Sequence, residues 1–513
     1  FLYFLQKKEF LAGDRSFLKS QYKKLRLDPE DTEYYSDVLE PLFFKTLNQY
    51  RPNLESQWGK IPYLNGGLFD KDYGEGHKDS AGQTTPNQII LPNALFDPGS
   101  TDSVLGFFNS YNFTITENMP EDEDVAIDPE MLGKVFENLL AEDERGKTGT
   151  FYTPRGIVQF MCTEVLARYL ADESGMALED VSKIIECDLE QPDADFNKLI
   201  TPQQAKKLKQ ALGTLKCLDP AVGSGAFPLG MMQVILKVRQ ASARREGMTV
   251  QRGSLTISQW KREIIANNLY GVDIKPEAIE IAKLRMWLSL VVDIPNIEDV
   301  EPLPNLDYKL MCGDSLISTI HGEQLIPDPT KTQQGMLAVT PVQQAIQPLM
   351  DLQHRYFSAQ SEERHDLRER ILEAEANVFR VAVGDHCNFW LGKHKELEDD
   401  IKLLKGKVSK VQEKKKAEIS AKLTELDRFA TEVESGERSL SFFQYHLHFR
   451  DVFESKGGFD VVIGNPPYVR QEQIKELKRF LEAGMLSGGV WIIPIYGLYL
   501  LVEELILINI LLF

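Results

Sequence analysis

Cysteine is scarce in this sequence, and no pattern links the few that are present. Five of the 513 residues are cysteine. None forms a CxxC pair or has a histidine partner at metal-ligand spacing: Cys162, Cys187, Cys217, Cys312 and Cys387. This excludes a disulfide framework and a structural zinc site, and we expect no metal. The scarcity indicates a reducing compartment and therefore a cytoplasmic protein.

A charged-then-apolar leader is also absent. The chain begins at Phe1 inside an expected helix (residues 1–13), so we expect a fragment whose true N-terminus lies upstream. The one long apolar stretch is the tail, residues 490–513, and Glu503 and Glu504 interrupt it. Because charges in mid-bilayer are costly, we expect no membrane span and interpret the tail as a truncated or frame-shifted end.

Positive charge is in deficit. The chain has 58 Lys and Arg against 77 Asp and Glu, a formal net charge of −19. An acidic surface repels phosphates, so composition counts against a nucleic-acid binder. The charge is uneven, however. Residues 117–130 concentrate acid, whereas Arg239, Arg244, Arg245 and the run from Lys405 to Lys416 concentrate base.

The texture of the chain changes near residue 149. Residues 1–148 predict an α-rich N-terminal region that ends in a helix over 129–144. Beyond it, apolar strand-like runs alternate with helices. The runs lie at 214–219, 269–273, 308–312 and 459–464, and the helices at 154–170, 225–240 and 276–290. This alternation predicts an α/β fold with a doubly wound, mostly parallel sheet. Residues 149–314 would form one half of it, and residues 456–489 would begin the other.

A long insertion, residues 315–455, separates the third and fourth strands. It begins as a loop and continues as helices with apolar residues spaced four-three-four-three: Leu397, Ile401, Leu404, Val408 and Val411, then Ile419, Leu423, Leu426, Ala430 and Val433. One interpretation is a solvated helical hairpin that packs on itself. The other is a helical arm that touches DNA through its lysines.

A glycine-rich turn follows the first strand, in LDPAVGSGAFPLG (218–230). Gly223 and Gly225 would let the backbone approach a ligand, and the Asp219 carboxylate could hold a cationic amino group. The turn lacks the Lys-Ser/Thr of a P-loop and the GxGxxG spacing, which favours a zwitterionic nucleoside over a phosphate. Asp273 ends the second strand, where it could accept both ribose hydroxyls, and Asp314 follows the third, where it could accept from an adenine amine.

The fourth strand runs into Asn465-Pro466-Pro467-Tyr468. The Asn465 side-chain oxygen and the Pro466 carbonyl could each accept one N–H of an exocyclic amine. Holding both hydrogens frees the nitrogen lone pair and stabilises the charge that develops on attack. Tyr468 would stack on a base flipped out of its duplex. The alternative, a proline-rich turn without chemistry, does not explain why the other three motifs accompany it.

These motifs resemble those of the N6-adenine DNA methyltransferases, and most closely the methylase portion of type IIG restriction–modification enzymes. The similarity covers about residues 1–480, including 62–69 and 128–140, which resemble the region between nuclease and methylase. It implies a Rossmann-like fold dependent on S-adenosylmethionine. It also implies methyl transfer to the N6 amine of a flipped adenine in double-stranded DNA, within a prokaryotic restriction–modification or related defence system.

The resemblance also implies residue roles. GTFYTP (149–154) resembles the N-terminal cofactor motif and would line the methionine side through Phe151, Tyr152, Thr153 and Pro154. The main cofactor motif contributes Asp219, Ala221, Gly223, Ser224, Gly225 and Phe227. Asp273 with the adjacent Ile274 corresponds to the ribose acid, and Asp314 to the adenine contact. Asn465, Pro466, Pro467 and Tyr468 form the catalytic motif.

Two departures bear on the parent protein. No nuclease constellation of the PD…(D/E)xK type is found, and the tail does not resemble the family's further strands and target-recognition domain. If the parent protein carries a nuclease, we expect it upstream of Phe1, and a recognition domain would lie downstream in the same parent. Two alternatives stay open: an enzyme with the same motif that acts on RNA or on protein glutamine, and a remnant without turnover.

Overall fold

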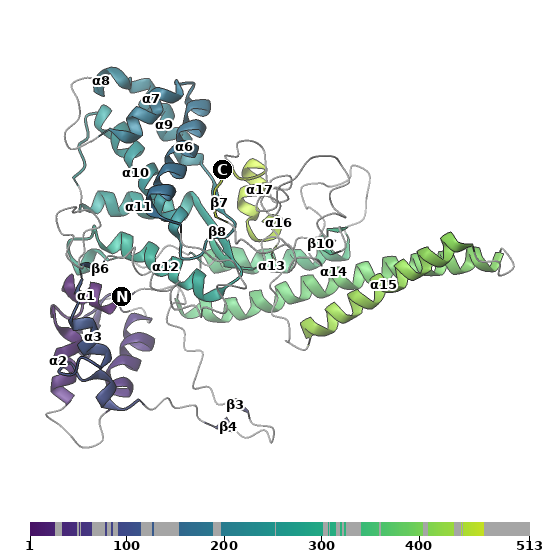
Figure 1. Cartoon of the computed structure of the whole chain (residues 1–513), viewed down its shortest axis with the longest axis horizontal. Helices are drawn as coiled ribbons and strands as arrows, with labels where there is room; N and C mark the ends of the chain where they lie inside the picture. The colour runs from purple at the N-terminus through teal and green to yellow at the C-terminus, as the bar shows by residue number, and fades with distance from the viewer. Residues whose placement is uncertain are drawn as a thin grey trace.

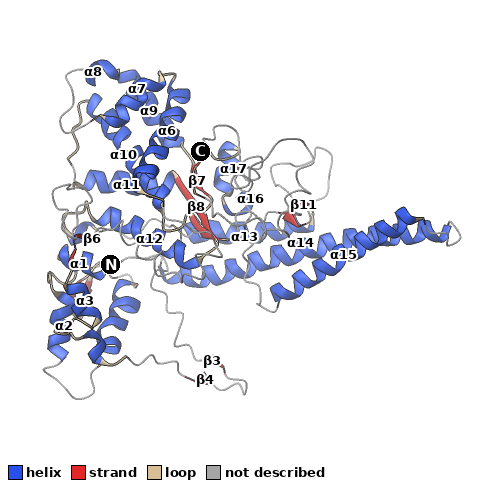
Figure 2. Cartoon of the chain, in the orientation of Figure 1, coloured by secondary structure: helices blue, strands red, loops and turns tan. Residues whose placement is uncertain are grey.

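Four short parallel strands form the sheet at the centre of the molecule. In the computed structural model their order is β12 (Val461–Val462), β7 (Cys217–Asp219), β8 (Leu269–Asp273) and β9 (Leu310–Cys312). Every neighbouring pair is parallel. The four runs predicted as strands are thus confirmed as one parallel sheet, and Figure 2 shows it between helices.

The structure describes most but not all of the chain. The described residues are 1–25, 33–48, 51, 53–63, 77–78, 84–85, 91–113, 126–127, 153–187, 196–251, 253–300, 306, 308–313, 319–320, 323–324, 340–358, 361–403, 409–434, 443 and 445–465. The helix predicted over 129–144 and the apolar tail lie outside them.

Both faces of the sheet are buried, which explains why its strands are nearly continuous apolar runs. Successive side chains of a strand point to opposite faces. Cys217 and Leu269 therefore join the large core beneath the helices of the cofactor half. Leu218 and Tyr270 join a second cluster with Phe449 and other aromatic side chains that precede β12. The sheet is thus sandwiched between two apolar layers.

Helices of the cofactor half surround the first of these layers. They are α6 (Arg155–Ser174), α7 (Leu178–Glu186), α8 (Phe196–Leu199), α9 (Pro202–Thr214), α10 (Ala226–Arg245), α11 (Leu255–Asn267) and α12 (Pro276–Val291). A capping box between Thr201 and Gln204, with Pro202 in the first turn, starts α9. The predicted helix at 154–170 is confirmed, although Pro154 occupies its N-cap and the helix continues to Ser174.

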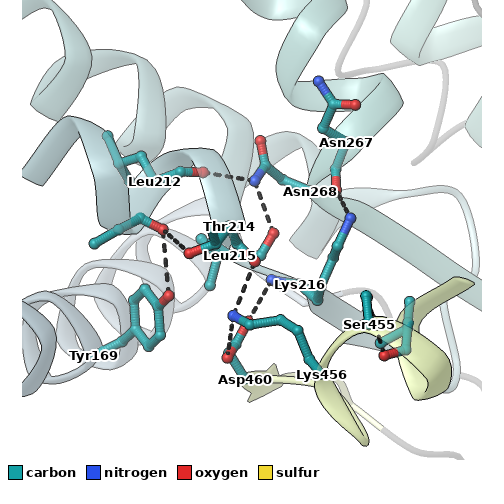
Figure 3. Close-up of polar contacts among 12 residues, drawn as sticks. Tyr169, Leu212, Thr214, Leu215, Lys216, Asn267, Asn268, Ser455, Lys456 and Asp460 are labelled. Carbon is teal, nitrogen blue, oxygen red and sulfur yellow. Dashed lines mark hydrogen bonds and ion pairs between the residues drawn. The ribbon is translucent and has the colours of Figure 1, made fainter.

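A polar cluster ties the strands together at the amino end of the sheet (Figure 3). The Asp460 carboxylate accepts the backbone N–H of Lys216 at 2.7 Å and pairs with the Lys456 ammonium at 2.6 Å. In return, the Asp460 N–H donates to the Lys216 carbonyl oxygen at 2.9 Å. Asn268 donates to two carbonyl oxygens at the end of α9, at 2.7 and 2.8 Å. These contacts fix where β7, β8 and β12 begin.

The described part of the N-terminal region is built from short helices. They are α1 (Leu2–Lys7), α2 (Phe17–Leu25), the π-helices η1 (Tyr35–Leu39) and η2 (Leu42–Leu47), the 3-10 helix η3 (Asn93–Phe96) and α3 (Val104–Asn109). Two-residue strands also pair in this region: β1 (Glu55–Ser56) with β2 (Gly59–Lys60), β3 (His77–Lys78) with β4 (Thr84–Thr85), and β5 (Asn112–Phe113) with β6 (Ala126–Ile127). Figure 1 shows β3 and β4 apart from the helices. Figure 1 shows this purple region at one end of the molecule.

The N-terminal region docks on the segment after α12. The Lys8 ammonium donates to the carbonyl oxygens of Val292 and Ile294 at 2.6 and 3.0 Å. Lys60 pairs with Glu298 of the 3-10 helix η4 (Ile297–Asp299) at 2.6 Å. Because Lys8 binds carbonyl oxygens at a helix C-terminus, its charge complements the helix dipole there.

The insertion between β9 and β12 is largely helical. It contains the strand pair β10 (Thr319–Ile320) and β11 (Glu323–Gln324), then α13 (Pro341–Ser358), α14 (Ser361–Leu403), α15 (Lys410–Glu434), α16 (Tyr445–His448) and α17 (Arg450–Lys456). In Figure 1, α14 and α15 run side by side and extend away from the sheet. Val411, predicted in the apolar seam, is instead 66% exposed. No helix in the described part of the chain is both long and apolar enough to cross a bilayer.

Candidate active site at the carboxyl edge of the sheet

The segments that carry the predicted motifs meet at one edge of the sheet. Because all four strands are parallel, their carboxyl ends lie together. The glycine-rich turn leaves β7, Asp273 closes β8, and Asn465 follows β12 by three residues. Three motifs separated by up to about 250 residues of sequence are therefore neighbours in space.

The glycine-rich turn has the conformation that its sequence predicts. Gly223 and Gly225 have positive φ angles of +50° and +85°, and Gly225 is the N-cap of α10. A Cβ on Gly225 would lie 3.1 Å from the Cβ of Ala282 on α12. A Cβ on Gly223 would meet nothing within 4 Å. The turn therefore packs tightly on α12 at Gly225 and is open at Gly223.

Asp219 is a buried acid beneath this turn. Its side chain is 1% exposed, and one carboxylate oxygen accepts the backbone N–H of Ala221 at 3.0 Å. The other oxygen has no hydrogen-bond partner among the described residues. Burial, with a smaller contribution from the charge of Asp273, raises the pKa of Asp219 to about 8. An acceptor of this kind is suited to a cationic donor from a ligand.

Asp273 links β8 to the glycine-rich turn. One carboxylate oxygen accepts the Gly223 N–H at 2.8 Å, and the other accepts the Lys275 N–H at 2.9 Å. Desolvation nevertheless raises the pKa of Asp273 above its ordinary value. Each carboxylate oxygen has a second lone pair, so the side chain retains acceptor capacity for a hydroxyl.

The end of β12 passes directly over Asp219. A Cβ on Gly464 would lie 2.6 Å from the Asp219 carboxylate oxygen, so only glycine fits this crossing without a shift. The Ile463 N–H donates to the Leu218 carbonyl oxygen at 2.9 Å and holds the strand in place. Asn465, the next residue after Gly464, therefore emerges beside the glycine-rich turn.

The Asn465 side chain has a partner on a third segment. Its Nδ2 donates to Thr153 Oγ1 at 3.0 Å, across 312 residues of sequence. Thr153 and Pro154 immediately precede α6. The hydrogen bond joins the residue predicted to be catalytic with one predicted to line the cofactor. Because the side-chain amide nitrogen of Asn465 donates to Thr153, the side-chain oxygen of Asn465 is the atom that remains as an acceptor for a ligand.

One buried cation behind the turn was not identified from the sequence. Arg285 of α12 is 4% exposed, and its guanidinium donates to the carbonyl oxygen and to Oγ of Ser224, at 2.7 and 3.1 Å. It thereby fixes the middle of the glycine-rich turn from below. The sequence feature that could have identified Arg285 is its position inside the apolar run LRMWLSL (284–290). A charged side chain in such a run is expected to be buried and to need a partner.

The remaining predicted residues fall into three groups. Ile274 is 58% exposed at the edge, while Ala221 is half-buried there. Phe227 is 3% exposed and packs in the core, where its carbonyl oxygen accepts from the Cys162 thiol at 3.7 Å. The others lie outside the described residues: Phe151, Tyr152, Asp314, Pro466, Pro467 and Tyr468.

Among the described residues, the edge offers acceptors and backbone amides, together with the exposed thiol of Cys312 at the end of β9. In the part of the chain that the structure covers, no group of three or more His, Cys, Asp or Glu side chains could hold a metal ion. The thiols of Cys162 and Cys217 are buried, and burial raises the pKa of each. The arrangement is suited to binding and orienting a polar ligand and an amine.

Comparison with known proteins gives two matches. Residues 267–497 match the sequence model of the family described as Eco57I restriction-modification methylase. The chain is also 28% identical, over 517 aligned residues, to a protein of Methanocaldococcus jannaschii provisionally described as a type II restriction enzyme and methyltransferase. That alignment covers 91% of this chain but 40% of the relative, so the chain spans less than half of the relative's length.

Proposed function

We propose that this chain is part of a restriction–modification methylase, since residues 267–497 match the model of that family, and from this premise we propose a specific reaction. The chain transfers the methyl group of S-adenosylmethionine to the N6 amine of an adenine flipped out of double-stranded DNA. The observation that carries this proposal is the position of Asn465 beside the glycine-rich turn. Gly464 crosses over Asp219, and Asn465 donates to Thr153. A methyl donor bound at the glycine-rich turn and an amine bound at Asn465 would therefore be neighbours.

The residues of the edge fit the proposed cofactor. S-adenosylmethionine carries a cationic amino group, a ribose and an already activated methyl group on a sulfonium. The unpaired oxygen of Asp219 is a buried acceptor for the amino group. In this proposal Asp273 would accept from the ribose, and Ile274, exposed beside it, would offer an apolar surface to the adenine ring. Gly223 leaves open space where the ligand would approach.

Catalysis in this proposal is placement and electrostatics. The Asn465 carbonyl oxygen accepts one hydrogen of the adenine amine, and the Pro466 carbonyl accepts the other. The nitrogen lone pair is then directed at the methyl group, and the developing positive charge faces two acceptor dipoles. Tyr468 stacks on the flipped base. No enzyme nucleophile would take part: as the bond from nitrogen to the methyl carbon formed, the carbon–sulfur bond would break, a neutral thioether would leave, and the methylated amine would lose one N–H proton to solvent.

The proposal extends to the parent protein. We place the chain in a type IIG enzyme, with a nuclease upstream, a target-recognition domain downstream, and a sheet of the doubly wound, Rossmann-like type. The relative's description, which combines a restriction enzyme with a methyltransferase, and the share of its length outside the alignment support this placement.

A methyl-transfer assay tests the substrate class. The chain is incubated with tritiated S-adenosylmethionine and, in separate reactions, with duplex DNA, RNA or a peptide release factor. We expect label in DNA alone, recovered as N6-methyladenine after nuclease digestion. If the label appeared in RNA or in protein glutamine instead, that molecule rather than DNA would be identified as the substrate. Cofactor binding without label in any of the three would identify a remnant without turnover.

A further inference from the structure

The insertion forms a projecting arm whose base and tip differ in character. At the base, α13 and the first half of α14 share a buried apolar cluster that includes Leu349, Val378 and Val383. Val383 is the last buried residue of α14 among those described. The helix continues for another 20 residues to Leu403, about 30 Å at 1.5 Å per residue. Helix α15 returns along it (Figure 1).

The distal part of the arm is held by polar contacts rather than by a core. Lys416 of α15 pairs with Glu398 of α14 at 2.9 Å, and the Lys422 ammonium lies 3.8 Å from the centre of the Trp390 ring. Apolar side chains of the two helices, such as Leu397 and Leu423, are only partly buried here, so these polar contacts add to an open seam. The end of the arm is therefore a hydrated structure that projects from the methylase body.

The tip concentrates positive charge in an acidic protein. The sequence 402–416 contains seven lysines and one glutamate, whereas the whole chain has a net charge of −19. Among the described residues, Lys402 lies in the last turn of α14, and Lys410, Lys414, Lys415 and Lys416 lie in the first two turns of α15. Self-repulsion among lysines destabilises a surface unless a polyanion neutralises them. The described lysines lie where α14 ends and α15 begins, on helices that extend away from the sheet (Figure 1), in a chain whose net charge would otherwise repel phosphates.

Several lysines of the tip form no strong ion pair with an acidic side chain among the described residues of the arm. Lys402 pairs with Asp399 at 3.1 Å, but Lys410 and Lys415 form no ion pair among the described residues. Lys414 lies 3.9 Å from Glu418 and is 80% exposed, so that pair is weak. Lys410 and Lys414 are one helical turn apart, so they share a face of α15, and both are exposed.

We propose that the lysines at the tip of the arm, Lys410, Lys414 and Lys415, bind the phosphate backbone of the duplex DNA on which the chain acts. This inference rests on the proposed function, because it takes duplex DNA as the partner. Flexible ammonium groups bind phosphates without reading sequence, which suits an anchor remote from the target base. A protein partner is disfavoured, since Val411 is the one exposed large apolar side chain of the described tip and provides no apolar interface core.

The salt dependence of DNA binding tests this proposal. The wild-type chain is compared with a triple variant, Lys410→Gln, Lys414→Gln and Lys415→Gln, by fluorescence anisotropy with a labelled duplex at several salt concentrations. Each lost phosphate contact lowers the slope of log K against log salt by about 0.9. We expect the slope to fall by about 2 to 3 and the affinity at 0.1 M salt to fall at least about tenfold, with cofactor binding unchanged.

A matched control separates the arm from general electrostatics. Lys23, Lys24 and Lys206 are exposed on α2 and α9, and their replacement by Gln removes the same charge elsewhere. We expect the control triple to retain the wild-type slope. An arm variant that behaves like the control, while the wild type binds and methylates DNA, would overturn the arm's role and leave the proposed function intact. A wild type that binds no duplex DNA would overturn both.

Discussion

At the scale of single residues, the site depends on how one amide is oriented. An asparagine side chain can present either its oxygen or its nitrogen, and an amine substrate requires the oxygen. In the structure the Asn465 Nδ2 donates to Thr153 Oγ1, and this orientation leaves the side-chain oxygen of Asn465 for the amine. Thr153 is therefore a positioning residue in this account, in addition to the place beside the cofactor that its motif implies.

Replacing Thr153 distinguishes the two roles. Thr153→Val keeps the shape and removes the acceptor, so we expect kcat to fall about five- to tenfold, the worth of one hydrogen bond of roughly 1 kcal/mol. The dissociation constant of the cofactor should change little, and Thr153→Ser should restore kcat. A Val variant with normal kcat and weakened cofactor binding would assign Thr153 to the cofactor alone.

Asp219 makes the stability of the ligand-free chain depend on pH. Its pKa is about 8 in the folded chain, against roughly 3.9 when exposed to water. Between these values the folded state retains a proton that the unfolded state releases, so stability falls as pH rises from about 4 to about 8. Asp219→Asn removes this dependence. In thermal unfolding at pH 5, 7 and 9, the Tm of the variant relative to that of the wild type should rise as the pH rises. A difference between the two that stays constant with pH would contradict the assignment.

At the scale of elements, the register of β12 decides where Asn465 lies. A strand advances about 3.3 Å per residue and alternates its faces, so a slip of one residue would turn Asn465 away from the edge. Asp460 opposes such a slip at the start of the strand. It accepts the Lys216 N–H, pairs with Lys456 and donates its own N–H back to Lys216.

Removing the Asp460 side chain should affect turnover more than cofactor binding. Asp460→Ala leaves a partly buried Lys216 N–H without its acceptor, and we expect a loss of about 1–3 kcal/mol in unfolding free energy. We also expect a lower kcat at a temperature where the variant is folded. Asp460→Asn retains the acceptor and should be milder. The exposed Glu179 of α7 provides a control through Glu179→Ala. If Asp460→Ala and Glu179→Ala changed the unfolding free energy and kcat equally, Asp460 would have no role in the register of β12.

Most elements that support the site could be predicted, and the reason lies in their burial. Strands such as Leu269–Asp273 read as apolar runs because both sheet faces are covered. Helix α11 (Leu255–Asn267) was not predicted, although Ile257, Trp260 and Ile264 have helical spacing, and this face packs on α10 and α12.

At the scale of the whole molecule, the meeting of the motifs was predictable while the contacts between regions were not. Alternating strands and helices imply parallel strands, and parallel strands bring Asp219, Asp273 and Asn465 to one edge. By contrast, Lys8 donates to a carbonyl oxygen 284 residues away, and nothing in its local sequence indicates this partner. The arm was predicted in part. The sequence indicated its distal helices and its lysines, but it did not decide between a hairpin packed on itself and an arm that projects from the sheet.

The central claim is that Asn465 acts on the amine and not on the cofactor, and Asn465→Ala tests it most directly. Isothermal titration should give a dissociation constant for S-adenosylmethionine within about twofold of the wild type, since Asp219 and Asp273 are untouched. Methyl transfer to adenine in duplex DNA should fall by about 10²- to 10³-fold, as expected for the loss of one acceptor of the developing charge. A variant that methylates DNA at the wild-type rate would contradict the account.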